Sequence, residues 1–305
     1  MTGAAEWDAE IAIDAAIART AIGRQFRQLA PLPIEPFGEG WDNAAFLVGD
    51  AWVFRFPRRR VAVALMETEL RVLPALAPRL PLPIPLPRFA GRPSDAFGWP
   101  FAGYARLPGR PLTECVLDDD AETAAAVACG TFLRALHAIA PATLPTLPRD
   151  EAGRFEHARC MPKLRVRLAE LHALGLIEDP APLLAFQERI APAGPRADRL
   201  CVVHGDLYAR HLLIADARVS GAIDWGDVHV GDPALDLAIG ITIFSPNSRP
   251  AFARAYGEID ERTWDLARYR GIYSSALVAH YGYRVGDAGL LQSGLRVLNA
   301  HGGLR

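Results

Sequence analysis

Two aspartates each follow a short apolar run of the chain. Asp206 comes after Val202-Val203-His204-Gly205, and Asp224 closes the run Gly221-Ala222-Ile223. This pattern predicts two short buried strands joined by a turn, with one carboxylate presented at the exit of each strand. Phosphoryl transfer needs such a pair, because one aspartate positions the attacking hydroxyl and another holds the metal ion that bridges the nucleotide phosphates.

Three segments around these aspartates carry a family resemblance. They are His204-Gly205-Asp206-Leu207, Asp224-Trp225-Gly226 and Gly231-Asp232-Pro233-Ala234-Leu235-Asp236-Leu237-Ala238. At these residues the chain resembles the aminoglycoside phosphotransferase family, which also contains macrolide phosphotransferases and choline-kinase-like enzymes. The first two segments correspond to His-Arg-Asp-Leu and Asp-Phe-Gly of protein kinases. The resemblance implies an α+β, bilobal protein-kinase-like fold, with a small antiparallel-sheet N-lobe and a larger, mainly helical C-lobe.

The resemblance also implies how the chain is divided. Residues 1–104 would form the N-lobe, 105–109 the hinge, and 110–305 the C-lobe with the catalytic loop and the acceptor pocket. Backbone groups at Ala105 and Leu107 would pair with the base of the nucleotide. Because backbone alone does not tell adenine from guanine, both ATP and GTP remain open as co-substrates.

The metal ligands follow from the same resemblance. Asp224 would bind Mg²⁺, or Mn²⁺ in its place, and the family has asparagine five residues after Asp206 for a second ion. This chain has His211 at that position. An imidazole can coordinate a metal, but Mg²⁺ prefers oxygen ligands. His211 is therefore either a metal ligand or a substitution that weakens the second metal site.

Residues 34–57 read as strand, glycine turn, strand, tight turn and strand. Taken alone, Gly38-x-Gly40 predicts a hairpin turn. The resemblance implies more, because a kinase N-lobe has its phosphate-covering loop at this place. Gly38, Gly40 and Asn43 are accordingly expected to cover the nucleotide.

Arg55 lies in the third of these strands, where kinases use a lysine that binds phosphates. An arginine supplies a permanent cation with several donors, so it can fill the same electrostatic role. Residues 61–76 have helical character and offer Glu67 and Glu69 as partners. Spacing like that of the family's helix-C glutamate favours Glu69. The alternative for Arg55 is a surface arginine beside Arg58-Arg59-Arg60.

Further elements are expected from hydrophobic periodicity and from proline and glycine positions. Helices are predicted over 8–29, 123–139, 155–190 and 249–298, a hairpin over 91–100, and a proline-bounded lead into the catalytic strand at 192–195. The acidic run Asp118–Asp120 indicates a capped helix start. His137 and His204 are expected to be structural hydrogen-bonding residues, and Asp232 and Asp236 to brace the loop through backbone N–H groups.

Composition limits the class of protein. The chain has 305 residues, of which 50% are hydrophobic, and a formal charge of −2. The length favours two lobes, and the absence of a basic excess argues against nucleic acid as a partner. The first residues show neither a signal peptide nor a membrane span, so a cytoplasmic protein is expected. Four cysteines without a Cys-x-x-Cys pair predict free thiols. Nothing indicates an oligomeric state.

Together, these expectations predict a small-molecule kinase that transfers the γ-phosphoryl group of ATP or GTP to a hydroxyl of an antibiotic-like acceptor. A polycationic aminoglycoside needs acidic residues such as Asp118–Asp120, Asp227, Glu258, Asp260 and Glu261. A macrolide needs an apolar surface, which the aromatic residues of the C-terminal helices could supply. A metabolite kinase of the same fold remains open. From another class, a catalytically weak nucleotide-binding protein remains open because of His211.

Overall fold

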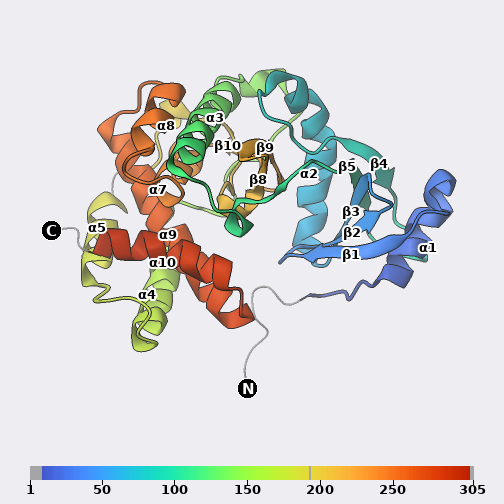
Figure 1. Ribbon diagram of the computed structural model, residues 1–305, viewed down its shortest axis with the longest axis horizontal. Helices are drawn as coiled ribbons and strands as arrows, with labels where there is room; N and C mark the ends of the chain where they lie inside the picture. The colour runs from blue at the N-terminus through green and yellow to red at the C-terminus, as the bar shows by residue number, and fades with distance from the viewer. Residues whose placement is uncertain (1–8, 192–193, 303–305) are drawn as a thin grey trace. The chain divides into compact units, whose positions relative to one another are not determined.

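The computed structural model describes residues 9–191 and 194–302, which divide into two compact units (Figure 1). The sheet unit comprises described residues up to 79, together with 83–107 and 224–227. The helical unit comprises 80–82, 108–223 without 192–193, and 228–302. The one unit is built on an antiparallel sheet and the other is mainly helical, which confirms the predicted α+β class.

The sheet unit contains a five-stranded antiparallel sheet with the strand order β1-β2-β3-β5-β4. Its strands are β1 (Ile34–Glu39), β2 (Asn43–Val48), β3 (Trp52–Pro57), β4 (Pro87–Gly91) and β5 (Phe101–Ala105). Alternate residues of β2 and β3 are buried, as expected for strands with one face on a core. The core contains Phe46, Phe54, Phe56 and Phe101. The three strands predicted over 34–57 are confirmed.

Two helices complete the sheet unit, α1 (Ala15–Gln25) and α2 (Arg60–Leu76). The predicted start of the first helix, Asp8, lies outside the described residues. Residues 9–14 are not helical, so the predicted helix 8–29 is too long at its N-terminal end. Asp14 caps α1 instead, with its carboxylate accepting from two backbone N–H groups. At the other end, Phe26 leaves the helix and packs its ring against Phe89.

The helical unit holds two small antiparallel sheets beside the segment that contains Asp206. In one, β7 (Cys201–Val203) pairs with β10 (His229–Gly231); in the other, β8 (Leu212–Ala215) lies between β6 (Arg110–Pro111) and β9 (Arg218–Ala222). The predicted strands before Asp206 and Asp224 are thus present. They are not joined by one turn, because the apolar run Leu212–Ala215 forms a strand of its own between them.

The longer helices of this unit follow the predicted regions. They are α3 (Asp119–His137), α4 (His157–Ala173), α5 (Ala181–Ile190), α8 (Arg249–Tyr256), α9 (Glu261–Val285) and α10 (Ala288–Gly302), with the short α6 (Ala234–Leu237) and α7 (Ile239–Thr242). Asp118 caps α3 by accepting from the N–H of Ala121 at 2.8 Å, so the acidic run is a capped helix start. The helix therefore begins a turn before the predicted residue 123. Short 3₁₀ helices cover 27–29, 77–79, 112–114, 141–143, 197–199 and 209–211.

Two expectations from composition can be compared with the structure. Cys115, Cys129, Cys160 and Cys201 are all free thiols, as predicted. Burial raises the pKa of Cys129 to about 12, so this thiol stays protonated.

Within residues 9–191 and 194–302, none of the helices has the length and apolar character needed to span a bilayer.

Two buried histidines on the packed pair α9 and α10 give the helical unit a predicted pH dependence. Burial lowers the pKa of His280 and of His301, although Glu170 beside His280 and the Val297 carbonyl beside His301 act in the opposite direction. The unfolded chain, with an ordinary histidine pKa near 6.5, binds more protons between the folded and unfolded pKa values. The free energy of unfolding should therefore fall as pH drops through that window.

Chemical denaturation at pH 7.5 and at pH 5.5 measures this dependence. His280→Gln and His301→Gln should each flatten it, because each removes one group that takes up a proton on unfolding. An unchanged difference between the two pH values in the double variant would contradict the prediction.

Candidate functional site

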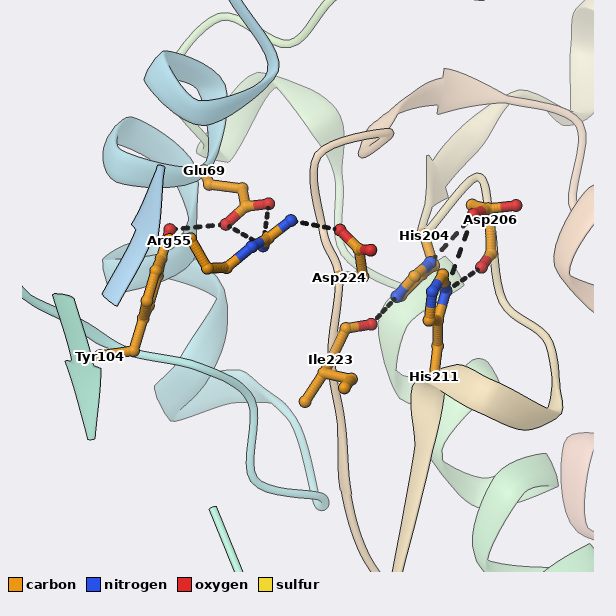
Figure 2. Close-up of polar contacts among 8 residues, drawn as sticks. All are labelled: Arg55, Glu69, Tyr104, His204, Asp206, His211, Ile223 and Asp224. Carbon is orange, nitrogen blue, oxygen red and sulfur yellow. Dashed lines mark hydrogen bonds and ion pairs between the residues drawn. The ribbon is translucent and has the colours of Figure 1, made fainter. Parts of the chain in front are cut away.

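A partly buried arginine organises the polar groups of the sheet unit. Arg55 lies on β3 between Phe54 and Phe56, which point into the core, so its side chain takes the other face of the sheet. Its Nη1 donates to both carboxylate oxygens of Glu69, at 2.8 and 3.0 Å, and its Nη2 donates to Oδ1 of Asp224 at 2.6 Å (Figure 2). The sequence favoured Glu69 over Glu67 as the partner of Arg55. Glu67 is exposed on α2, whereas Glu69 is buried there.

The charges of this cluster hold one another in place. Burial alone would lower the pKa of the Arg55 guanidinium, but the Asp224 and Glu69 carboxylates outweigh it and raise that pKa. Burial raises the pKa of Glu69, against the opposing effect of Arg55. Arg55 is therefore a fixed cation that pairs with two carboxylates. Glu69 is buried, whereas the Asp224 side chain is 43% exposed.

Tyr104 also belongs to this cluster, although it was not among the residues predicted from the sequence. Its hydroxyl donates to Oε2 of Glu69 at 2.7 Å (Figure 2). Burial, followed by the neighbouring Glu69 charge, raises the pKa of the Tyr104 phenol well above its usual value. The contact depends on β5 pairing with β3, which places Tyr104 opposite Val53. No local sequence pattern reports that pairing.

Tyr104→Phe should lower the free energy of unfolding by about 1.5–3 kcal/mol, the usual value of a hydrogen bond to a charged group. Glu69 would lose one of its donors inside a buried site. Urea denaturation of the variant and of the wild type measures the difference. Tyr283→Phe is the matched control, because Tyr283 is 44% exposed. Equal stability of the two variants would contradict a role for the Tyr104 hydroxyl.

Asp224 has an unusual backbone conformation. Its φ is +64°, in the left-handed region that residues other than glycine seldom adopt and that aspartate tolerates better than most. Such a conformation costs on the order of 1 kcal/mol and is found most often at functional sites. Two residues on, a Cβ at Gly226 would lie 3.2 Å from the Leu65 side chain, so the close approach of this segment to α2 favours glycine.

A partly exposed carboxylate suits a hard divalent cation. Mg²⁺ is often held by one or two carboxylates and by the phosphates of its substrate, so Asp224 fits such an ion. Across the part of the chain that the structure describes, no group of three or more His, Cys, Asp or Glu side chains could hold a metal ion without a substrate.

Three of the predicted nucleotide-binding residues lie at the glycine turn: Gly38 in β1, Gly40 between the strands and Asn43 at the start of β2. The N–H of Gly40 donates to the carbonyl of Asn43 at 2.9 Å, which closes the turn. A Cβ placed at Gly38 would meet open space. The side-chain oxygen of Asn43 is buried and has no hydrogen-bond partner among residues 9–191 and 194–302.

Two arginines that directly follow β3 secure this turn, although no sequence pattern singled them out. Arg58 donates from its guanidinium to the carbonyl of Gly40 at 2.9 Å and from its backbone N–H to the carbonyl of Asp42 at 2.7 Å. Arg59 forms an ion pair with the Asp42 carboxylate at 2.9 Å. Burial, followed by the nearby Asp227 and Asp224 charges, raises the pKa of Asp42 against the effect of Arg59.

The predicted hinge residues lie at the end of β5. Ala105 is the last residue of this strand and pairs with Trp52 of β3. The next backbone N–H, from Arg106, donates to the carbonyl of Ala51 at 2.8 Å. Leu107 follows as the last residue of the segment 83–107 of the sheet unit and is partly exposed.

In the helical unit, the loop after β7 is held mainly by Asp236. This fully buried carboxylate accepts from the N–H of His204 at 2.7 Å and from the N–H of Gly205 at 3.0 Å. Burial would raise the pKa of Asp236, but the hydrogen bond and the charge of His137 outweigh it and lower that pKa. Gly205 has φ +88°, which glycine adopts without strain. Asp236 thus braces the loop, as the sequence suggested.

His204 fixes the same loop from inside. Its Nε2 donates to the carbonyl of Ile223 at 3.0 Å, because a carbonyl can only accept, and its Nδ1 accepts from the N–H of Asp206 at 3.3 Å (Figure 2). His204 is fully buried. It is a structural hydrogen-bonding residue in this geometry and does not reach solvent as a base would.

Asp206 itself presents its side chain to solvent, with 45% of it exposed. His211 donates from Nδ1 to the backbone carbonyl of Asp206 at 2.7 Å and lies 3.7 Å from the Asp206 carboxylate. This bond leaves only Nε2 of His211 able to coordinate a metal. The ring is buried and in contact with the ring of Tyr208, at a centroid separation of 4.3 Å. His211 therefore holds the backbone from which the Asp206 carboxylate projects.

The predicted residues consequently gather in two groups. Arg55, Glu69 and Asp224 lie together in the sheet unit, while Asp206 and His211 lie together in the helical unit. Each group combines a half-exposed carboxylate with buried partners that fix it. Charged groups held in this way suit a reaction that depends on positioning and electrostatics.

Comparison with known proteins gives a consistent result. Residues 33–272 match the model of the phosphotransferase enzyme family. A viomycin phosphotransferase from Streptomyces vinaceus is 32% identical over 204 residues, which cover 63% of this chain and 67% of that protein.

Solved structures agree with the fold. The GDP complex of a wild-type aminoglycoside 2′-phosphotransferase superposes with a TM-score of 0.69 at 23% identity, covering 95% of this chain and 98% of that one. The apoenzyme of a macrolide 2′-phosphotransferase from Brachybacterium faecium superposes with a TM-score of 0.54 at 26% identity, covering 88% and 92% of the two chains. These likenesses confirm the predicted fold class.

Proposed function

Since this chain belongs to the phosphotransferase enzyme family, we propose that it transfers the γ-phosphoryl group of ATP or GTP to a hydroxyl group of a small molecule. The observation that carries the proposal is the Arg55 guanidinium, held between Glu69 and Asp224 at 2.8 and 2.6 Å. A fixed cation beside an accessible carboxylate is what a nucleotide triphosphate with its metal ion requires.

We assign a role to each described side chain. Asp206, half exposed on a braced loop, accepts or orients the proton of the attacking hydroxyl. Arg55 neutralises phosphate charge, and Glu69 holds Arg55 in position. Asp224 would hold Mg²⁺ or Mn²⁺, which when bound supplies positive charge to the phosphate oxygens. His211 would take a second ion only through Nε2.

The nucleotide is proposed to lie under the glycine turn and along the hinge. Gly38, Gly40 and Asn43 would cover the phosphates, and the backbone at Ala105 and Leu107 would pair with the base. This corresponds to an N-lobe over 1–104, a hinge over 105–109 and a C-lobe over 110–305. The GDP in the similar aminoglycoside 2′-phosphotransferase supports a purine nucleotide.

The acceptor is proposed to be a hydroxyl-bearing small molecule of the kind that the relatives modify. Those relatives are named for viomycin, aminoglycosides and macrolides. A metabolite kinase fits the same cluster of charges. His211 favours one alternative function, a nucleotide-binding protein with weak turnover. Its Nδ1 already donates to the Asp206 carbonyl, so only Nε2 could bind a second metal ion.

Nucleotide binding and turnover test the proposal together. ATP or GTP should raise the melting temperature, and Mg²⁺ or Mn²⁺ should increase that effect. Nucleoside diphosphate release should rise when the right hydroxyl compound is added from a panel of sugars, aminoglycosides, macrolides and small polyols. AMP serves as the control ligand that lacks a transferable phosphoryl group. Metal-independent stabilisation with no acceptor-stimulated release would support the weak nucleotide-binding protein instead.

A further inference from the structure

Arg58 contacts the glycine turn at three residues. Its guanidinium donates from Nη1 to the carbonyl of Gly40 at 2.9 Å and pairs from Nη2 with the Glu39 carboxylate at 2.7 Å. Its backbone N–H donates to the carbonyl of Asp42 at 2.7 Å. Only 17% of the Arg58 side chain is exposed, although the Glu39 carboxylate lies mostly in solvent. One residue therefore fixes both sides of the turn.

The carbonyl of Arg58 contacts a different part of the chain, the segment 9–14. It accepts from the backbone N–H groups of Glu10 and Ile11, at 2.9 and 3.1 Å. The Glu10 carboxylate in turn accepts at 3.1 Å from the N–H of Arg60, the first residue of α2. Glu10 thus places an acceptor and a negative charge at the N-terminus of that helix, where both are favourable.

Apolar contacts anchor the segment 9–14 in the sheet unit. Ile11 and Ile13 are partly buried against the core cluster that contains Ala44 and Phe46 of β2. Their burial adds a hydrophobic contribution to the backbone hydrogen bonds. The segment is therefore held independently of the glycine turn and serves as a fixed support for the residue that secures the turn.

We propose that Arg58 is a positioning residue for the nucleotide phosphates and that the segment 9–14 is the support through which it acts. The inference rests on the proposed function, in which the glycine turn covers the phosphates. A turn that is already held in shape loses less conformational freedom when the ligand arrives, so binding is tighter. A planar guanidinium suits this role, because its several fixed donors reach a carbonyl and a carboxylate together.

Dissociation constants for a nucleoside triphosphate and for the nucleoside alone test the role of Arg58. ATP and adenosine, and GTP and guanosine, are titrated in the presence of Mg²⁺ into wild type, Arg58→Gln and Arg58→Lys. Arg58→Gln should raise the Kd of the triphosphate about 10-fold. The Kd of the nucleoside should not change, because the proposed base contacts use the hinge backbone. Arg58→Lys should fall between, since an ammonium keeps the charge without the planar fork.

Glu10→Ala separates support of the turn from a long-range effect of charge. The variant removes a negative charge from the sheet unit, so electrostatic attraction alone would tighten triphosphate binding. Loss of the support should instead weaken triphosphate binding about 2- to 5-fold and leave nucleoside binding unchanged. Because the two effects have opposite signs, this variant decides the question even if Arg58→Gln does not fold.

Two substitutions in the same unit are matched controls, Arg19→Gln and Glu35→Ala. Arg19 donates to the carbonyl of Ile34, the first residue of β1, at the end of that strand away from the glycine turn. Glu35 is exposed on the same strand. Both variants should keep the wild-type Kd values for triphosphate and nucleoside.

Three results would overturn the inference. They are equal losses of triphosphate and nucleoside binding in Arg58→Gln, full recovery of triphosphate binding in Arg58→Lys, and unchanged or tighter triphosphate binding by Glu10→Ala. The first indicates general loss of structure, and the other two indicate that charge or another contact acts in place of the support.

Failure of the proposed function appears in the wild type instead. In that case neither ATP nor GTP binds to the wild-type protein, and the inference falls with the function. Failure of the inference alone leaves triphosphate binding by the wild type intact and appears only in the variants. Because these titrations need no acceptor, they apply equally to a nucleotide-binding protein with weak turnover.

Discussion

Replacing Asp206 by asparagine is expected to slow phosphoryl transfer about 10²- to 10⁴-fold and to leave nucleotide binding almost unchanged. Asparagine has nearly the same size and can accept a hydrogen bond, but it cannot take the proton of the attacking hydroxyl. The loop should keep its shape, because it is held through the backbone of Asp206. That backbone donates to His204 and accepts from His211. A thousandfold loss corresponds to about 4 kcal/mol of barrier.

Acceptor-stimulated release of nucleoside diphosphate, at saturating nucleotide, measures this effect. The matched control is Asp216→Asn, in the exposed turn between β8 and β9 of the same unit. Asp216 has φ +50°, which asparagine also tolerates. The control should keep its turnover, and both variants should keep the thermal shift with nucleotide. If Asp206→Asn turned over within a few-fold of wild type, another group would have to orient the hydroxyl.

The sequence predicted best those features that are local. The alternation of apolar residues over 34–57 specifies three strands, and Glu69 was chosen over Glu67 because its spacing resembles that of the family's helix-C glutamate. A short-range pattern is enough for both, because the burial of a strand or helix face repeats with a fixed period. The assignment of Asp206 and Asp224 to a motif is local in the same sense.

Features that depend on distant partners were not predicted. The Tyr104 hydroxyl reaches Glu69 only because β5 joins the sheet beside β3. Likewise, Arg58 and Arg59 contact the turn that contains Asp42 only because the pairing of β2 with β3 brings the two segments together. Such contacts join residues far apart in the chain, and no periodicity records them.

Helix ends illustrate a further limit of local patterns. Both Asp8 and Asp14 could cap a helix that contains the same apolar residues. Asp14, whose own backbone is extended, is the cap that the structure describes. A capping residue stabilises a helix by about 1 kcal/mol, and either aspartate could contribute it. The periodicity of apolar residues does not show which of the two is the cap.

Asp224→Asn is the second large effect, and it should separate metal binding from nucleotide binding. Asparagine tolerates the left-handed backbone at φ +64°, so the fold should persist. Loss of the carboxylate removes a hard oxygen ligand and the partner that Arg55 contacts at 2.6 Å. The added thermal stabilisation by Mg²⁺ should disappear, while stabilisation by nucleotide alone should persist or increase, because Arg55 becomes available to phosphate.

Turnover of this variant should fall by about 10³-fold, since a catalytic metal ion contributes several kcal/mol of charge stabilisation. Titration of Mg²⁺ and Mn²⁺ into the nucleotide complex, followed by thermal shift and by product release, measures both effects. Asp50→Asn, in the exposed turn between β2 and β3 of the same unit, is the control and should behave as wild type. If Mg²⁺ stabilised the nucleotide complex of Asp224→Asn as much as that of wild type, Asp224 would not be a metal ligand. The Arg55 cluster would then be a structural ion pair and would no longer support phosphoryl transfer.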